Sequence, residues 1–149
     1  MGIGGERCPR RPPLAKSGGM IDGGPGLEAL SGQVIGAALE VHRRLGPGLL
    51  ESAYQACLAV ELRERRLRFQ REAALRVAYK GRTVDTAYRM DFVIEGRILV
   101  EIKSVEHVAD IHVAQTLTYL RLSGIPLGFL LNFNVRRLAD GIRRLVQHL

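Results

Sequence analysis

Aromatic residues and cysteines are scarce in this sequence. It has no tryptophan, four phenylalanines and four tyrosines among 149 residues, so the stacking of bases on aromatic side chains is not an obvious binding mode. The two cysteines, Cys8 and Cys57, lie in a leader rich in proline and arginine and on the apolar face of a predicted helix. A disulfide between them is not expected, and a reducing compartment suits the chain better.

Long apolar runs are also missing. No stretch reaches the roughly 20 apolar residues that a membrane span requires, and the N-terminus lacks the positive-then-apolar order of a signal peptide. We therefore expect a cytoplasmic protein that has no membrane partner.

Positively charged residues outnumber negatively charged ones, and the formal net charge is +7. A basic domain attracts polyanions because lysine and arginine neutralise phosphates. Many basic domains bind no nucleic acid, so the charge permits such a partner without identifying it.

Glycine and proline dominate residues 1–30, which show no apolar periodicity before Leu27. Such a segment cannot bury enough apolar surface to offset the entropy lost on ordering. We predict a disordered tail over residues 1–30 and one domain over residues 31–149, a length that can bury about two-thirds of its unfolded surface.

Apolar periodicity and turn residues predict the order ααβββαβα for this domain. Two helices over residues 31–45 and 49–67 precede three strands over residues 73–79, 82–94 and 97–105, which should form an antiparallel meander. A helix over residues 110–122 and a strand buried on both faces, residues 126–133, imply a crossover into the same sheet. A last helix is expected from about residue 135. The predicted fold class is α/β with a mixed sheet and helices on both faces.

Three charged residues interrupt the apolar strands of the meander: Asp91, Glu101 and Lys103. Burying an ionised carboxylate costs several kcal/mol unless it is paired or bound to metal. A divalent cation would satisfy both carboxylates, whereas a simple ion pair between Asp91 and Lys103 is the competing interpretation.

Hairpin register decides whether these side chains can meet. A two-residue turn at Glu95-Gly96 would put Asp91 and Glu101 on opposite faces of the sheet. A three-residue loop over residues 94–96, with Gly96 in a left-handed conformation, puts Asp91, Glu101 and Lys103 on one face. We predict the second register, because only it gathers Phe92, Val100 and Ile102 on the opposite, apolar face.

Glu51 is a further candidate. Helical spacing places it in line with Tyr54, Leu58 and Leu62 on the stripe predicted to face the sheet. A glutamate at that position could complete a carboxylate cluster around Mg²⁺, which prefers oxygen ligands and retains several waters.

These residues resemble a known family. The run Gly48-Leu49-Leu50-Glu51-Ser52-Ala53-Tyr54 matches the signature of the GxxExxY protein family. Further resemblances are the stretch from Ile35-Gly36 to Gly48, Asp91, Val100-Glu101-Ile102-Lys103, Gln115 to Tyr119 and Leu131-Asn132-Phe133-Asn134. That family is grouped with the PD-(D/E)XK nuclease superfamily. One departure is Met90, which stands where the superfamily's name has a proline.

The resemblance implies cleavage of nucleic acid, with DNA preferred over RNA, using Mg²⁺ or Mn²⁺. It assigns metal binding to Asp91, Glu101, the carbonyl of Ile102 and Glu51. Lys103 would position or polarise the attacking water, and Gln115 would be the polar residue on the helix after the third strand.

Two other functions stay open at this point. One is a nuclease fold that has lost catalysis and serves as a nucleic-acid-binding or protein-interaction module. The other is hydrolysis of a small phosphodiester. The sequence does not fix the oligomeric state, and a dimer is compatible with it.

Overall fold

The computed structural model describes residues 26–147. Within this range the elements are α1 (Leu27–Leu45), α2 (Glu51–Glu64), β1 (Phe69–Tyr79), β2 (Arg82–Ile94), β3 (Ile98–Lys103), α3 (Asp110–Ser123), β4 (Leu127–Asn132), a 3-10 helix η1 (Leu138–Gly141) and β5 (Ile142–Val146). None of the helices in the described range has the length and apolar character of a membrane span.

The five strands form one mixed sheet in the order β1-β2-β3-β4-β5. β3 and β4 are parallel, and the other neighbouring pairs are antiparallel. The meander of β1, β2 and β3 and the crossover through α3 are therefore as predicted. β4 is buried along its whole length, as its continuous apolar run indicates.

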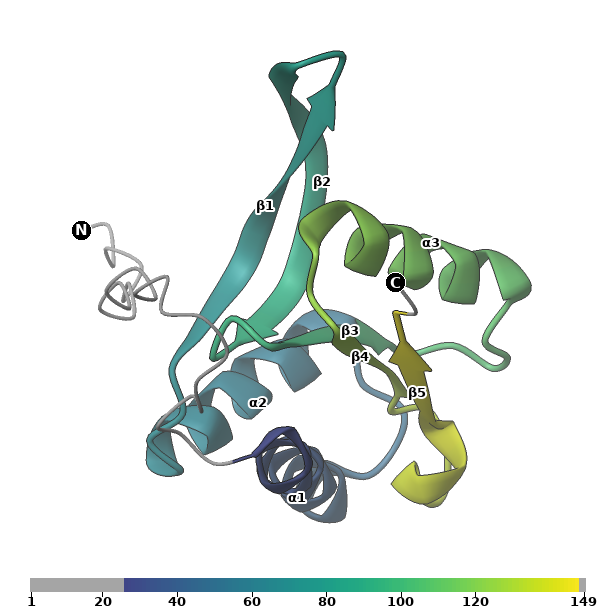
Figure 1. The fold of residues 1–149 in the computed structure, drawn as a ribbon. Helices are drawn as coiled ribbons and strands as arrows, with labels where there is room; N and C mark the ends of the chain where they lie inside the picture. Colours follow the sequence, from purple (N-terminus) through teal and green to yellow (C-terminus); the bar gives the residue numbers. More distant parts are fainter. Residues whose placement is uncertain (1–25, 148–149) are drawn as a thin grey trace, which may run out of the picture.

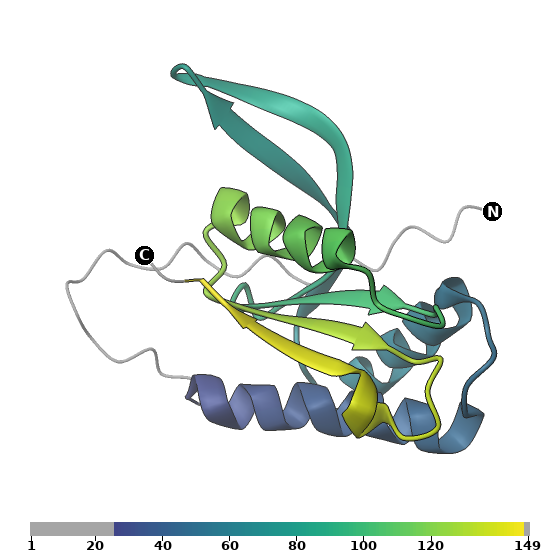
Figure 2. The same cartoon turned by 90° about the vertical axis from the view of Figure 1, so that its right-hand side faces the viewer.

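Helices cover both faces of the sheet, which confirms the predicted α/β class (Figure 2). α1 and α2 lie against one face, where their apolar side chains pack with Phe92, Val100 and Ile102. α3 covers the other face, where Tyr119 and Leu120 pack with Val93 and Leu99. β3 thus has a packed apolar layer on each side.

The predicted last helix is wrong. Residues 138–146 form η1 and β5 instead, and β5 pairs with the free edge of β4. Ile142 packs into the core of α1 and α2, whereas Leu145 packs on the α3 side. The three-residue spacing of these apolar side chains, which is typical of a helix, here places them on opposite faces of a strand. Gly141 also packs so closely on the carbonyl of Asn132 that a side chain there would collide with it. Tertiary pairing overrides local periodicity here.

The predicted tail lies mostly outside the described residues. Residues 27–30 of it belong to α1, and Leu30 is fully buried. The ordered domain therefore begins before residue 31.

Candidate active site

Asp91 and Glu101 meet where β2 and β3 separate. The ladder between the strands joins Ile94 to Ile98 and Phe92 to Val100, and this register places Asp91 opposite Glu101. The predicted shared face is therefore correct. The loop is displaced by one residue from the prediction, covering residues 95–97, and Gly96 has the expected positive φ of 65°.

Each carboxylate binds a backbone amide of the other strand. The N–H of Asp91 donates to Glu101 Oε1 at 3.0 Å, and the N–H of Ile102 donates to Asp91 Oδ2 at 2.8 Å. These bonds replace the ladder beyond Phe92 and fix both side chains. The two carboxyl groups also share a side-chain hydrogen bond, which contributes to the raised pKa of Glu101.

The two carboxyl groups share an environment that disfavours negative charge. Glu101 is only 7% exposed. Burial, followed by the charge of Asp91, raises the pKa of Glu101 to about 8. Burial also raises the pKa of Asp91 to about 6, opposed by the hydrogen bond from Ile102 and assisted by the charge of Glu72. A carboxyl pair of this kind holds a proton or needs a cation.

Lys103 supplies the positive charge closest to this pair along β3. Its side chain is half-buried, and its ammonium lowers the pKa of both Asp91 and Glu101. It therefore acts on the pair rather than on Asp91 alone, which separates the arrangement from a simple Asp91–Lys103 ion pair. The Lys103 carbonyl accepts the N–H of Phe133 at 2.9 Å, which fixes the end of β3.

Glu51 is positioned differently from the prediction. Tyr54, Leu58 and Leu62 are buried as expected, but Glu51 is half-buried at the first turn of α2, where its charge suits the helix dipole. It raises the pKa of Asp91. Nevertheless, among residues 26–147 no three His, Cys, Asp or Glu side chains are close enough together to hold one metal ion. The structure thus pairs Asp91 with Glu101 and leaves Glu51 outside that pair.

Glu51 instead lines an open cavity of about 520 Å³ beside the carboxylate pair. The other lining residues are Leu49, Leu50, Ser52, Gln55, Glu72 and Ser104. Ser104 directly follows Lys103, and its hydroxyl donates to the carbonyl of Leu49 at 2.6 Å. This bond ties the loop before α2 to the end of β3, so the cavity borders the site even though Asp91 and Glu101 do not line it.

Glu72 is a site residue that the sequence does not reveal. The pairs on either side of it, Arg71 with Phe92 and Ala73 with Met90, place it opposite Asp91. Its φ of 51° lies in the left-handed region, which is uncommon for a residue other than glycine. Strain of this type is frequent next to functional groups.

Gln115 reaches the site through a neighbour. Its Nε2 donates to the hydroxyl of Tyr119 at 2.7 Å. The pKa of Tyr119 is raised by burial and then by the charge of Glu101. α3 therefore presents a Gln115–Tyr119 pair to the carboxylates from its face of the sheet.

Comparison with known proteins identifies one matching family. Residues 28–145 match the family model described as the PD-(D/E)XK nuclease superfamily. No curated protein and no solved structure is significantly similar to the chain.

Proposed function

We propose that this chain, which belongs to the PD-(D/E)XK nuclease superfamily, is a nuclease that hydrolyses nucleic-acid phosphodiesters with Mg²⁺ or Mn²⁺. DNA is the preferred substrate in this proposal. The observation that carries it is the Asp91–Glu101 pair, in which Glu101 is buried and Asp91 half-buried. Strand amides fix both side chains, and burial raises the pKa of both carboxyl groups.

The donor set fits a hard divalent cation. Mg²⁺ in proteins is commonly held by one or two carboxylates and keeps several waters, and Asp91 and Glu101 each have one oxygen outside the amide hydrogen bonds. Ile102 offers a third donor, because the N–H and C=O of a strand residue point to the same side and its N–H is directed to Asp91. Glu51, across the cavity edge, would act on waters of the ion.

The remaining residues prepare the reaction. A bound cation would lower the pKa of a water ligand and offset charge on the phosphate. Lys103 would hold or polarise the attacking water and stabilise the negative charge that develops on the phosphate. Gln115 is proposed as a positioning residue that orients the Tyr119 hydroxyl. The nucleophile is water, so no covalent enzyme intermediate forms.

Electrostatics outside the site supports a nucleic-acid partner. The net charge is +7, and positive potential raises the association rate of polyanions. We therefore expect affinity for polynucleotide, which a hydrolase of small phosphodiesters would not need.

The test is a cleavage assay on duplex DNA, single-stranded DNA and RNA with Mg²⁺ and with Mn²⁺. Wild type is compared with E101Q and K103A, and with E106Q as a control at an exposed glutamate. We expect E101Q to lose both cleavage and stabilisation by metal, K103A to lose cleavage by at least about 100-fold while keeping the stabilisation, and E106Q to retain both.

Two results would contradict the proposal. Cleavage that survives E101Q and K103A would place the active site elsewhere. Nucleic-acid binding without cleavage under any metal would favour the inactive binding module, a function that the missing third close ligand among residues 26–147 also suits.

A further inference from the structure

The outer parts of β1 and β2 leave the sheet as a two-stranded arm, which we define as residues 76–89. β2 pairs with β3 only over residues 92–94, whereas its pairing with β1 continues to the turn at Lys80 and Gly81. The arm projects from the body of the protein beyond α3 (Figures 1 and 2).

The base of the arm is anchored so that it keeps one direction. Leu75 and Met90 are buried with Tyr119 and Leu120 of α3, and the ring of Tyr88 lies 5.9 Å from that of Tyr119. An isolated two-stranded hairpin is only marginally stable in water. Packing on α3 therefore lets a short ribbon stand away from the sheet.

The inner face of the ribbon changes sides at the active site. Phe69 packs in the core of α1 and α2, whereas Ala73 and Leu75 pack on the α3 side. In a regular strand these three residues would lie on the same face, because their positions differ by even numbers. The change occurs around Glu72, the residue with positive φ opposite Asp91. The residue opposite Asp91 thus coincides with the point where β1 changes the face on which it packs.

The arm is basic and exposed. Its charged residues are Arg76, Lys80, Arg82, Arg89 and Asp85, four positive and one negative, which gives a net charge of +3 over residues 76–89. All five are exposed, and Arg76 is paired with Asp85 at 3.4 Å. Lys80 and Arg82 therefore concentrate the free positive charge at the tip.

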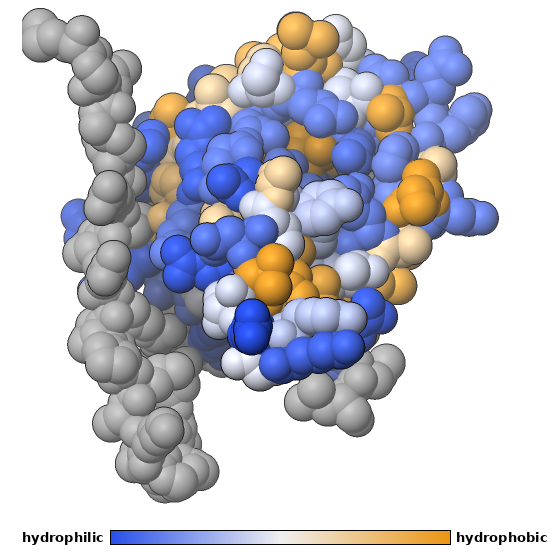
Figure 3. All heavy atoms as spheres, turned by 90° about the horizontal axis from the view of Figure 1, so that it is seen from above, coloured by the Kyte–Doolittle hydropathy of each residue, from blue (hydrophilic) through white to orange (hydrophobic). Residues whose placement is uncertain are grey.

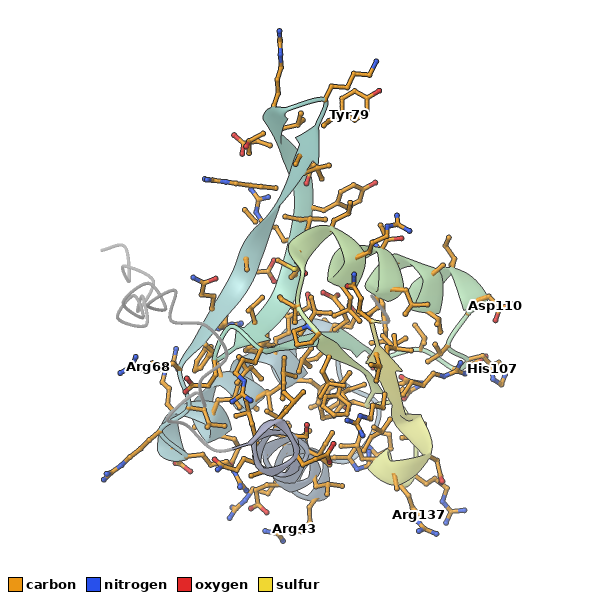
Figure 4. The ribbon with its side chains drawn as sticks, in the orientation of Figure 1. Arg43, Arg68, Tyr79, His107, Asp110 and Arg137 are labelled. Carbon is orange, nitrogen blue, oxygen red and sulfur yellow. The ribbon has the colours of Figure 1, made fainter. Side chains whose placement is uncertain are left out.

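The tip also carries aromatic surface. Tyr79 is 61% exposed and marks the end of the arm in Figure 4, with the Lys80 ammonium 5.5 Å from its ring centre. From above, the face toward which the arm points is mainly hydrophilic, with scattered hydrophobic side chains (Figure 3). Such a surface suits a charged partner better than an apolar one.

We propose that the arm enters the major groove of double-stranded DNA, with Lys80 and Arg82 binding phosphates at the groove walls. This inference rests on the proposed function and narrows its substrate to duplex DNA. The major groove of B-DNA is about 12 Å wide and admits a two-stranded ribbon, whereas the major groove of A-form RNA is too narrow for protein side chains to read.

The distance between the tip of the arm and the active site determines how far along the duplex the arm can bind. Arg82 and Asp91 belong to the same strand, nine residues apart, so at about 3.3 Å per residue they are separated by up to roughly 30 Å. One turn of duplex DNA is about 34 Å long. The arm therefore contacts the duplex up to about one helical turn from the bond that is cut.

The test removes the tip charges with K80Q/R82Q. The matched control is R136Q/R137Q, which removes the same charge from exposed residues, and Figure 4 places Arg137 at the end of the molecule away from Tyr79. Affinity for a labelled 30-base-pair duplex and for one of its strands is measured in EDTA over a range of salt concentrations, so that cleavage does not interfere. Melting temperatures verify that both variants are folded.

We expect K80Q/R82Q to bind the duplex at least about tenfold more weakly at 0.1 M salt, with the log–log salt slope reduced by about 1.8. Its binding to the single strand, and the control's binding to either, should change less than about twofold. Equal weakening in both variants would show only diffuse charge attraction, and wild-type affinity in K80Q/R82Q would show that the arm does not bind duplex. Either result overturns the proposal.

Failure of the arm and failure of the nuclease function are distinguishable. Duplex binding that depends on Lys80 and Arg82 in a protein that cleaves nothing would leave the arm proposal standing and reject the nuclease. Cleavage of duplex DNA that is as fast in K80Q/R82Q as in wild type, with equal affinity, would reject the arm alone.

Discussion

The ring of Tyr54 stacks on the ring of Phe133, with centroids 4.5 Å apart and planes inclined by 19°. The Tyr54 hydroxyl donates to the carbonyl of Gly46 at 2.6 Å and accepts the N–H of Leu49 at 3.2 Å. Tyr54 therefore joins the loop before α2 to Phe133, which follows β4. Glu51, which lines the cavity, comes directly after this loop. The tyrosine that ends the run Gly48–Tyr54 therefore anchors the loop before α2.

We expect Y54F to lower the free energy of unfolding by about 1–2 kcal/mol, because it removes both hydrogen bonds of the hydroxyl while keeping the stacked ring. Urea unfolding measures the change. Y79F is the control: Tyr79 is 61% exposed, and its substitution should cost less than about 0.5 kcal/mol. Equal stability of Y54F and wild type would show that the loop does not depend on the hydroxyl.

The carboxylate pair predicts how stability depends on pH. The pKa of Glu101 is about 8 in the folded protein against an ordinary value of 4.5, so the folded state keeps a proton that the unfolded chain releases within this window. The stability contribution is fully present below about pH 4.5 and is lost as the pH rises to about 8. Since each pKa unit corresponds to about 1.4 kcal/mol, the melting temperature without metal should fall by several degrees between pH 5 and pH 8.

Mg²⁺ should oppose this loss. The ion binds the deprotonated carboxylates, so it should raise the melting temperature strongly at pH 8 and little at pH 5. Differential scanning fluorimetry of wild type, E101Q and the exposed control E106Q tests both effects. We expect E101Q to lose most of the pH dependence and the response to Mg²⁺, while E106Q behaves like wild type. A response to Mg²⁺ that E101Q keeps would place the ion elsewhere.

Much of this site follows from the sequence because strand alternation leaves few choices. Once Phe92, Val100 and Ile102 must share an apolar face, the hairpin register has to be even, and Asp91 and Glu101 then share the other face. The predicted loop would put Asp91 opposite Leu99, whereas the observed loop puts it opposite Glu101. The structure displaces the loop by one residue but keeps this parity. Both loops contain three residues, so moving the loop by one position leaves the two carboxylates on the same face.

The position of Glu72 could not be predicted in this way. The Lys80-Gly81 turn pairs Tyr79 with Arg82, and continuing that register would put Glu72 opposite Arg89. A shift between Ala74 and Arg76 puts it opposite Asp91 instead. Such a bulge depends on packing between α3 and the ribbon. The mistaken last helix has a similar cause, because β5 exists only where the edge of β4 is available to pair.

Glu72 gives a further prediction. Its φ of 51° costs a residue with a β-carbon about 1–2 kcal/mol, and its charge raises the pKa of Asp91. Asparagine tolerates this conformation and carries no charge, so E72N should raise the free energy of unfolding at pH 8 by about 1 kcal/mol. E64Q, at an exposed glutamate, is the control and should change stability by less than about 0.5 kcal/mol. A loss of stability in E72N would mean that the Glu72 carboxylate makes a favourable contact that outweighs the strain.

Asn132 stabilises the segment that follows Lys103. Its side chain is 3% exposed; Nδ2 donates to the carbonyl of Val105 at 2.9 Å, while Oδ1 accepts the N–H groups of Val105 at 3.1 Å and Asn134 at 3.2 Å. N132A removes these bonds and leaves backbone groups without partners, so it should cost about 2–3 kcal/mol. Amide hydrogen exchange at Val105 should accelerate with it, because the segment beyond β3 would open more readily. Q70A, at an exposed glutamine of β1, serves as the control for truncating a polar side chain. Unchanged exchange at Val105 in N132A would show that β3 and β4 alone hold this segment, and Lys103 would then owe its position to the sheet rather than to Asn132.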